Sequence, residues 1–409
     1  MRELLRYRDF RLLFVGQTLS IFGDTAMLLV LAMWAKSLTN SNGIAGSVLF
    51  AVALPGLLSP LAGLLVDRLP RRKVMIATDL TTAVVVLTLL AVSGRGDLWQ
   101  IYVVAFLYGA SLIVFQSARS AFVQGMLPDD LLGPANGVLT TVREAMRLVG
   151  PLAGAALFAL LGGGAVAVVD VVTFLVSAAA LLAMRGPDPR PRPSEHHWWP
   201  ETTAGLRHIR REPVLRHLVV ACIICLLVFG FAESVCFAVV QGLGRPVEFL
   251  GVLSTVQGVG AVLAGVATTV FIRRLGELRI VWFGLAVSAV GLLLVAGRGM
   301  APVVVGWFVF GAALPPIMVG VNTALQRRTP SELQGRTAAG FDLLTSVPYT
   351  LSIAVGAVLV GVVPYRALLL VMAFGVALSA VYAFVTLREP AVPRPAAALR
   401  PIASDAVPE

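Results

Sequence analysis

The sequence predicts an all-α membrane protein whose twelve transmembrane helices form two pseudo-symmetric six-helix bundles. Of its 409 residues, 58% are hydrophobic and only 13% are charged, and the mean hydropathy of +0.88 lies far above that of soluble domains. Apolar runs of about 20 residues recur along the chain, each long enough to cross a bilayer core of about 30 Å as a helix. The runs lack the alternating pattern of membrane barrels, so we expect helical spans that satisfy their own backbone hydrogen bonds.

The expected spans fall into two groups of six on either side of a polar linker. They lie near residues 12–35, 44–66, 74–93, 98–125, 137–161 and 164–184, and then near 215–241, 247–272, 278–297, 301–326, 337–362 and 365–387. The linker is proline-rich and then amphipathic, which favours a short surface helix. The predicted parts are an N-terminal bundle at 1–185, a cytoplasmic linker at 186–213, a C-terminal bundle at 214–388 and a disordered cytoplasmic tail at 389–409.

Basic residues mark the expected topology. Five of them lie in loops on the side opposite the N-terminus, namely Lys36, Arg95, Arg245, Arg298 and Arg366, and the others lie on the N-terminal side. The positive-inside rule then places both termini in the cytoplasm, and we expect a multi-pass protein of the bacterial inner membrane. The net charge of +10 does not indicate a nucleic-acid partner, because the basic residues cluster between spans.

The two halves of the sequence are related by a shift of 202 residues. This shift aligns the loop at 126–133 with the loop at 328–335, and Arg71–Arg72 with Arg273–Arg274. A repeat of six spans gives both halves the same orientation in the membrane. Such parallel repeats are typical of transporters that rock about a central site.

The charged loop "GLLVDRLPRRK" between the second and third spans resembles the loop 2–3 signature of the major facilitator superfamily, with Pro70 where the family usually has glycine. The resemblance implies a cytoplasmic gate in which Asp67 meets the start of helix 11. The predicted gate residues are Gly63, Asp67, Arg68, Arg71, Arg72 and Arg336. The alternative is that these charges only fix the membrane orientation.

The fifth span resembles, in part, a glycine-proline element of the family's exporters. Gly150, Pro151 and Gly154 match that element, which favours efflux, although a proline kink with a small-residue packing face explains the same residues. The same span carries Arg143, Glu144 and Arg147, either as an inner gate or as a group that pairs with itself. The chain as a whole is most similar to the macrolide-efflux type of drug:proton antiporters, whose relatives include siderophore exporters and lysophospholipid transporters. The arginine-containing element common in helix 4 of such antiporters is replaced by "AFLYG".

Charged residues inside apolar spans are functional candidates because they are costly in lipid. Asp24 lies near the middle of the first span, and Gln17 and Ser20 share its helical face. We expect this stripe to face a cavity and to couple transport to protons. Glu233 in the seventh span is a second candidate. Asp170 is interpreted as a structural residue near the outer surface, at the start of the sixth span.

The sequence therefore predicts a secondary active transporter that works by alternating access and exports amphipathic or hydrophobic small molecules in exchange for protons. The expected partners are a small lipophilic substrate, protons and membrane lipids, and we expect a monomer without cofactor, metal or enzymatic activity. Cys222, Cys225 and Cys236 share one apolar run and no histidine lies between them, so they do not indicate a metal site. Two alternatives remain: a lipid or lysophospholipid flippase of the same fold, and a membrane sensor that does not transport.

Overall fold

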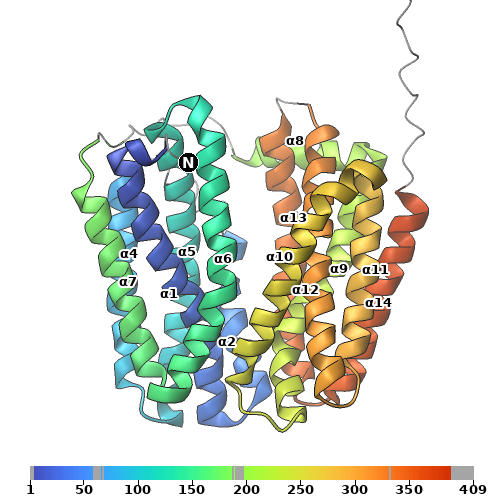
Figure 1. Cartoon of the computed structure of the whole chain (residues 1–409), viewed down its shortest axis with the longest axis horizontal. Coiled ribbons are helices and arrows are strands. Elements are labelled where there is room, and N and C mark those ends of the chain that lie inside the picture. The colour runs from blue at the N-terminus through green and yellow to red at the C-terminus, as the bar shows by residue number, and fades with distance from the viewer. Residues whose placement is uncertain are drawn as a thin grey trace, which may run out of the picture.

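The computed structural model describes residues 4–58, 66, 69–186, 188, 198–330 and 333–387, and these residues form helices and short connections without any strand (Figure 1). The first bundle contains α1 (Arg8–Thr39), α2 (Asn42–Ala53), α4 (Arg71–Leu87), α5 (Leu98–Met126), α6 (Asp129–Leu161) and α7 (Gly163–Ala183). The second contains α9 (Pro213–Gly242), α10 (Phe249–Leu275), α11 (Glu277–Val295), α12 (Met300–Arg327), α13 (Gln334–Leu359) and α14 (Tyr365–Thr386). Short 3-10 segments lie at Leu4–Arg6 (η1), Leu54–Leu58 (η2), Thr88–Ala91 (η3) and Arg95–Asp97 (η4).

The helical spans predicted from the sequence are confirmed. Eleven helices in the described part of the chain are long and apolar enough to cross a membrane, and the described part of the second span forms the shorter apolar segment Asn42–Leu58. The amphipathic stretch of the linker forms α8 (Trp198–Arg211), which packs on α13 and α9. The predicted tail at 389–409 lies outside the described residues.

The internal repeat is also visible in the helix boundaries. Helix α12 begins 202 residues after α5, and α14 begins 202 residues after α7. The shift that aligns the loops in the sequence therefore also aligns the helices, as expected for two pseudo-symmetric bundles.

Local sequence determines where several helices end. Asn40 ends α1 in the left-handed conformation (φ 57°), which asparagine tolerates better than most residues. The side chain of Ser41 then accepts a hydrogen bond from the Ile44 amide and caps α2. Gly162 (φ 79°) separates α6 from α7, and Gly276 (φ 84°) separates α10 from α11. These breaks let neighbouring helices run antiparallel.

The two bundles contact each other mainly through α2 with α13 and α9, and through α6 with α10. The hydrophobic cluster at the helix ends opposite the N-terminus combines Trp34 and Val48 of the first bundle with Phe237, Val240 and Leu253 of the second. The cluster near the N-terminus draws all of its described residues from the first bundle. The bundles are therefore joined at the end opposite the N-terminus, which we call the joined end.

Candidate functional site

A partly buried and a fully buried carboxyl group share one tyrosine inside the first bundle. The Tyr108 hydroxyl on α5 lies 2.8 Å from Oδ1 of Asp24 on α1 and 3.0 Å from Oδ2 of Asp170 on α7. The residues Tyr108 and Asp170 are both 0% exposed. Three helices thus bring one phenol and two acids together inside the first bundle, and Asp24 is the partly exposed member of the group.

The number of protons in this group follows from its hydrogen bonds. A phenol carries a single O–H and can donate it to only one carboxyl group at a time. Both contacts can be hydrogen bonds together only when one carboxyl group is protonated and donates to the phenol oxygen. We call the group of Asp24, Tyr108 and Asp170 the acid pair. Both contacts of the Tyr108 hydroxyl are hydrogen bonds when one of the two carboxyl groups carries a proton.

The backbone of α1 is shaped to accept Asp170. A Cβ atom at Gly23 would overlap Oδ1 of Asp170 and Oγ1 of Thr173, so the glycine lets α7 approach α1 closely. Oδ1 of Asp170 is buried and has no hydrogen-bond partner. An unsatisfied polar atom of this kind calls for a functional explanation.

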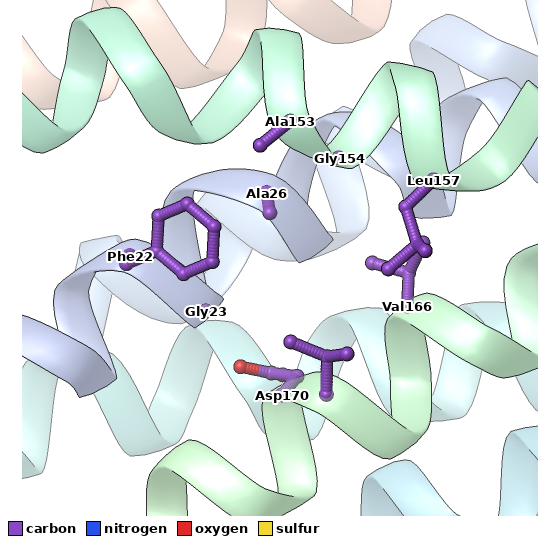
Figure 2. Close-up of a pocket in the computed structure, with 9 residues that line it drawn as sticks. Phe22, Gly23, Ala26, Ala153, Gly154, Leu157, Val166 and Asp170 are labelled. Carbon is purple, nitrogen blue, oxygen red and sulfur yellow. The ribbon is translucent and has the colours of Figure 1, made fainter.

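Asp170 also lines a pocket of about 310 Å³ between α1, α6 and α7. In Figure 2 its carboxyl group lies near Gly23, with the side chains of Phe22, Leu157 and Val166 around the same space. The lining residues are Phe22, Gly23, Ala26, Ala153, Gly154, Leu157, Val166, Val169 and Asp170. The pocket is apolar except for this one acid.

Further polar residues surround the acid pair within the bundle. Gln17 and Ser20 on α1 are 3% and 4% exposed, and Arg119 Nη1 on α5 donates to Gln17 Oε1 over 3.2 Å. Asp79 on α4 is 1% exposed, and its Oδ2 has no hydrogen-bond partner. The polar stripe expected around Asp24 therefore faces the interior of the first bundle.

The glycines of the exporter-like element pack against the residues of α1 that follow Asp24. A Cβ atom at Gly154 would lie 2.9 Å from Cα, Cβ and O of Ala26, and one at Gly150 would overlap the Thr25 side chain. The Thr25 hydroxyl lies 3.2 Å from the carbonyl oxygen of Met146 on α6. This element therefore holds α6 against the segment of α1 that follows Asp24.

The opposite side of α6 contacts the second bundle. A Cβ atom at Gly251 of α10 would lie 2.9 Å from the carbonyl oxygen of Pro151, and the Thr255 hydroxyl donates to the carbonyl of Leu148 over 3.1 Å. Helix α6 thus packs closely against α1 on one side and against α10 on the other.

The remaining candidates on α6 contact each other or a residue of α5. Glu144 and Arg147 make an i,i+3 ion pair of 3.5 Å between largely exposed side chains, and Arg143 donates to Gln116 over 3.2 Å. Exposed pairs of this type contribute little to stability. Whether they form an inner gate stays a prediction.

Glu233 lies on α9 in the second bundle, apart from Asp24. The Tyr349 hydroxyl of α13 lies 3.5 Å from its Oε1, at the limit of a hydrogen bond. Among the described residues no hydrogen bond or ion pair joins Glu233 to the acid pair. A role for Glu233 in coupling stays a prediction.

Only part of the predicted cytoplasmic gate can be placed, because Gly63, Asp67 and Arg68 lie outside the described residues. Arg71 donates to the carbonyl of Ala121 over 3.1 Å. Arg72 donates to carbonyls at the end of α7, at 2.7 Å for Leu181, 2.8 Å for Leu182 and 2.7 Å for Met184. A cation at a helix C-terminus is stabilising. These contacts of the two arginines thus lie within the first bundle.

Arg336, the gate residue predicted on helix 11, lies beside the linker helix. A Cβ atom at Gly205 of α8 would overlap the backbone carbonyl of Arg336 and would lie 2.9 Å from the amide nitrogen of Thr337. The predicted contact between Asp67 and this part of α13 stays a prediction.

A polar network links the bundles at the joined end. The Lys36 ammonium donates to Asn42 in its own bundle, and over 3.2 Å to the Phe237 carbonyl and 3.3 Å to Gln241 Oε1 in the other. The Asn42 amide donates to the same Gln241 oxygen over 2.7 Å. The position of Lys36 in the sequence indicates only the membrane topology. The structure adds that Lys36 links the two bundles by hydrogen bonds.

The interpretation of Asp170 as a surface residue at a helix start is wrong. Helix α7 begins at Gly163, so Asp170 lies two turns inside it and is 0% exposed.

Asp79 and Tyr108 were not singled out from the sequence. Both residues could have been noticed in the sequence. Asp79 is an acid inside an apolar span, and Tyr108 belongs to the "AFLYG" stretch, which differs from the family pattern by its missing arginine. The described residues contain no group of three or more His, Cys, Asp or Glu side chains suited to a metal ion.

Comparison with known proteins decides the family. The model of the Major Facilitator Superfamily matches residues 13–243 and again residues 234–404. The chain belongs to this superfamily. It is therefore a multi-pass membrane transporter of the major facilitator fold, and the resemblance to this superfamily seen in the sequence is confirmed.

Several relatives and solved structures share this fold. The chain is 27% identical over 371 residues to the uncharacterized MFS-type transporter YfiS of Bacillus subtilis (strain 168), covering 85% of each chain. It is 31% identical over 343 residues to the uncharacterized MFS-type transporter Rv0037c of Mycobacterium tuberculosis (strain ATCC 25618 / H37Rv), covering 78% and 76%. Macrolide efflux protein A of Streptococcus pyogenes is 23% identical over 189 residues, covering 44% of this chain and 47% of that protein.

The structural similarity extends over nearly the whole chain. A bacterial homologue of the iron transporter ferroportin in an inward-facing state gives a TM-score of 0.74 at 18% identity, covering 92% of this chain and 98% of that one. The nucleoside transporter NupG gives 0.71 at 14% identity, covering 93% and 99%. These similarities establish the fold.

Proposed function

We propose that this transporter works by alternating access and exports amphipathic or hydrophobic small molecules in exchange for protons. The observation that carries the proposal is the acid pair, because two carboxyl groups that share one phenol form a site for one exchangeable proton. A proton that crosses a potential of about 100 mV releases about 2.3 kcal/mol, which can drive the export of a substrate.

Two features of the chain support export by alternating access. Among the described residues, the hydrophobic cluster shared by the two bundles lies at the joined end, as expected for bodies that rock about a central site. The exporter-like glycines Gly150 and Gly154 pack against Thr25 and Ala26, the two residues of α1 that follow Asp24. The similarity to Macrolide efflux protein A over 189 residues agrees with a lipophilic substrate.

Three groups of residues have separate roles in this transport cycle. Asp24 carries the coupling proton together with Tyr108 and Asp170, while Gln17 and Ser20 complete the polar surroundings. The arginine-rich loop between the second and third spans closes the cytoplasmic side when the bundles rock. The protein is a monomer in the bacterial inner membrane with both termini in the cytoplasm, so the joined end faces outward and substrate enters from inside the cell.

The experiment is transport of a panel of lipophilic drugs into everted membrane vesicles with and without a pH gradient. Asp24→Asn and Asp170→Asn are compared with Asp97→Asn, a matched control whose carboxylate bonds only to Ser93 and Gly94 in a loop. We expect uptake that depends on the gradient in the native chain and the control, and its loss in both other variants. Gradient-dependent uptake that persists in Asp24→Asn and Asp170→Asn would refute the coupling site.

The same vesicles separate the alternatives. A flippase that moves a phospholipid needs a polar pocket of headgroup size, whereas the pocket between α1, α6 and α7 offers one carboxyl group, which repels a phosphate. Translocation of a labelled lysophospholipid without uptake of any drug would favour the flippase. The absence of transport of both would favour the sensor.

A further inference from the structure

We propose that the pocket between α1, α6 and α7 holds one acyl chain of a membrane phospholipid as a resident part of the first bundle. The lipid belongs to the leaflet next to the joined end. This chain is not a substrate and takes no part in proton exchange, so its role is distinct from the proposed transport function.

The pocket arises at an open seam between α6 and α7. Helix α1 packs along both of these helices, whereas α6 and α7 contact each other much less than either contacts α1. The buried residues Gly23 and Ala26 of α1 form the base of the pocket (Figure 2). Ala153 and Leu157 of α6 and Val169 of α7 are only half-buried and form its rim.

Water does not suit this space. The pocket has a volume of about 310 Å³, and eight of its nine lining residues are apolar or glycine. The ninth, Asp170, has Oδ2 in contact with Tyr108 and Oδ1 buried beside Gly23, so the lining offers water few partners. A buried water needs about two to four polar partners, and apolar cavities stay dry. Hydrocarbon is therefore the filling that matches the lining.

The pocket opens toward lipid and away from the second bundle. Ala155 of α6 faces α10, because a Cβ atom at Gly251 would lie 2.5 Å from Cβ of Ala155. Ala153 is two residues away and hence about 200° around the helix, on the nearly opposite face. Leu160, seven residues further on and thus on the same face as Ala153, is 80% exposed. Val172, one turn after Val169 on α7, is 52% exposed. Such apolar side chains on membrane-spanning helices contact lipid.

Close packing of α1 on α6 separates the pocket from the space between the bundles. A Cβ atom at Gly154 would lie 2.9 Å from Cα of Ala26, and one at Gly150 would overlap the Thr25 side chain. The Thr25 hydroxyl also lies 3.2 Å from the carbonyl oxygen of Met146. These contacts leave no room for a chain to pass between α1 and α6. The occupant is therefore a lipid chain that stays in the pocket, not a molecule on its way through the transporter.

The depth of the pocket matches the middle of an acyl chain. Gly162 turns α6 into α7 at the joined end, where a Cβ atom at Gly163 would overlap the ring of Trp34. Ala153 lies eight residues before the last residue of α6, Leu161, which is about 12 Å along the helix. One leaflet contributes about 15 Å of hydrocarbon. A phospholipid whose headgroup lies at the joined end therefore places its chain at the depth of the pocket.

The test is photo-cross-linking of the full chain in liposomes, without detergent. The probe is a phosphatidylethanolamine that carries a diazirine in the middle of one acyl chain, and labelled residues are mapped by tandem mass spectrometry. We expect labelling of α1 between Phe22 and Ala26, because bulk lipid reaches this segment only through the pocket. Labelling of the lipid-exposed Val172 is the internal reference for a folded chain in the membrane.

Two variants fill the pocket from opposite walls, which guards against the misfolding of either one. Ala153→Phe on α6 and Val169→Phe on α7 should each lower the labelling of α1, relative to that of Val172, by about tenfold, because a chain would now overpack the space. Ala156→Phe is the matched control, since Ala156 is exposed on the same helix and does not line the pocket. This variant should be labelled as the native chain is.

Three results would overturn the inference. The first is labelling of Val172 without labelling of α1 in the native chain, and the second is undiminished labelling of α1 in both filled variants. The third is displacement of the probe by an excess of a drug that the protein transports, which would indicate a substrate site. A phosphatidylglycerol probe should label α1 equally well, because the pocket contacts the chain and not the headgroup. None of these results depends on a pH gradient, so the inference and the proposed function fail separately.

Discussion

Replacing Gly154 by alanine tests the close contact between α6 and α1. The added Cβ atom would lie 2.9 Å from three atoms of Ala26, two of them backbone atoms of α1 that cannot rotate away. The helices must therefore separate, and overpacking of this kind costs about 1–3 kcal/mol. Alanine is also the better helix former by about 1 kcal/mol, so the net loss of stability is about 0–2 kcal/mol.

Gly137→Ala supplies the matched control on the same helix. A Cβ atom at Gly137 meets nothing within 4 Å, so this variant gains the helix propensity without the overlap. We expect Gly137→Ala to stabilise the protein by about 0.5–1 kcal/mol. The two substitutions are chemically identical, and their stabilities should differ by about 1–3 kcal/mol.

The assay is unfolding of the purified variants in one detergent, by denaturant titration followed with circular dichroism. Everted vesicles report transport in parallel, and we expect Gly154→Ala to reduce gradient-driven uptake because Asp24 lies two residues before Ala26 on α1. Equal stability of the two variants would show that α6 and α1 are not in close contact and would refute the reasoning.

Three further predictions concern other contacts. Gln241→Leu removes the side-chain acceptor that joins the bundles at the joined end. Because one or two hydrogen bonds of about 0.6 kcal/mol or more are lost, we expect the bundles to separate there more often. A thiol-labelling reagent applied from that side should then modify Cys236 about three to ten times faster. Arg95→Gln, whose native contacts lie within the first bundle, should leave that rate unchanged. Tyr108→Phe keeps the ring but removes the shared hydroxyl, and we expect it to abolish gradient-driven drug uptake into everted vesicles; full uptake would contradict the hydrogen-bond argument. Arg72→Gln should lower the unfolding free energy by about 1–2 kcal/mol in a denaturant titration, because α7 loses its C-terminal cation, and an unchanged midpoint would contradict this.

The helices could be predicted from the sequence because a bilayer imposes their length and composition. Single glycines at the turns, such as Gly162 and Gly276, follow from the same local rules. The first turn of α2 is likewise visible in the sequence as a serine cap. Asp24 could be singled out because an acid in the middle of an apolar run is costly wherever it points.

The partners of Asp24 could not be predicted, because they come from other helices. Tyr108 lies 84 residues away in sequence and Asp170 lies a further 62 residues on, so no periodicity connects them. Asp170 was misplaced because an acid near the beginning of an apolar run resembles a helix N-terminal residue. The packing of α7 against Gly23 and the contact with Tyr108 show that it points inward.

The packing of α8 against α13 has a practical consequence for expressing the protein as two fragments. Since Gly205 packs on the backbone at Arg336 and Thr337, α8 travels with the C-terminal fragment. A cut between Asp188 and Trp198 therefore keeps α8 on the same polypeptide as α9 and α13, the two helices on which it packs. Co-expression of the two fragments would allow each to carry its own isotope label or tag.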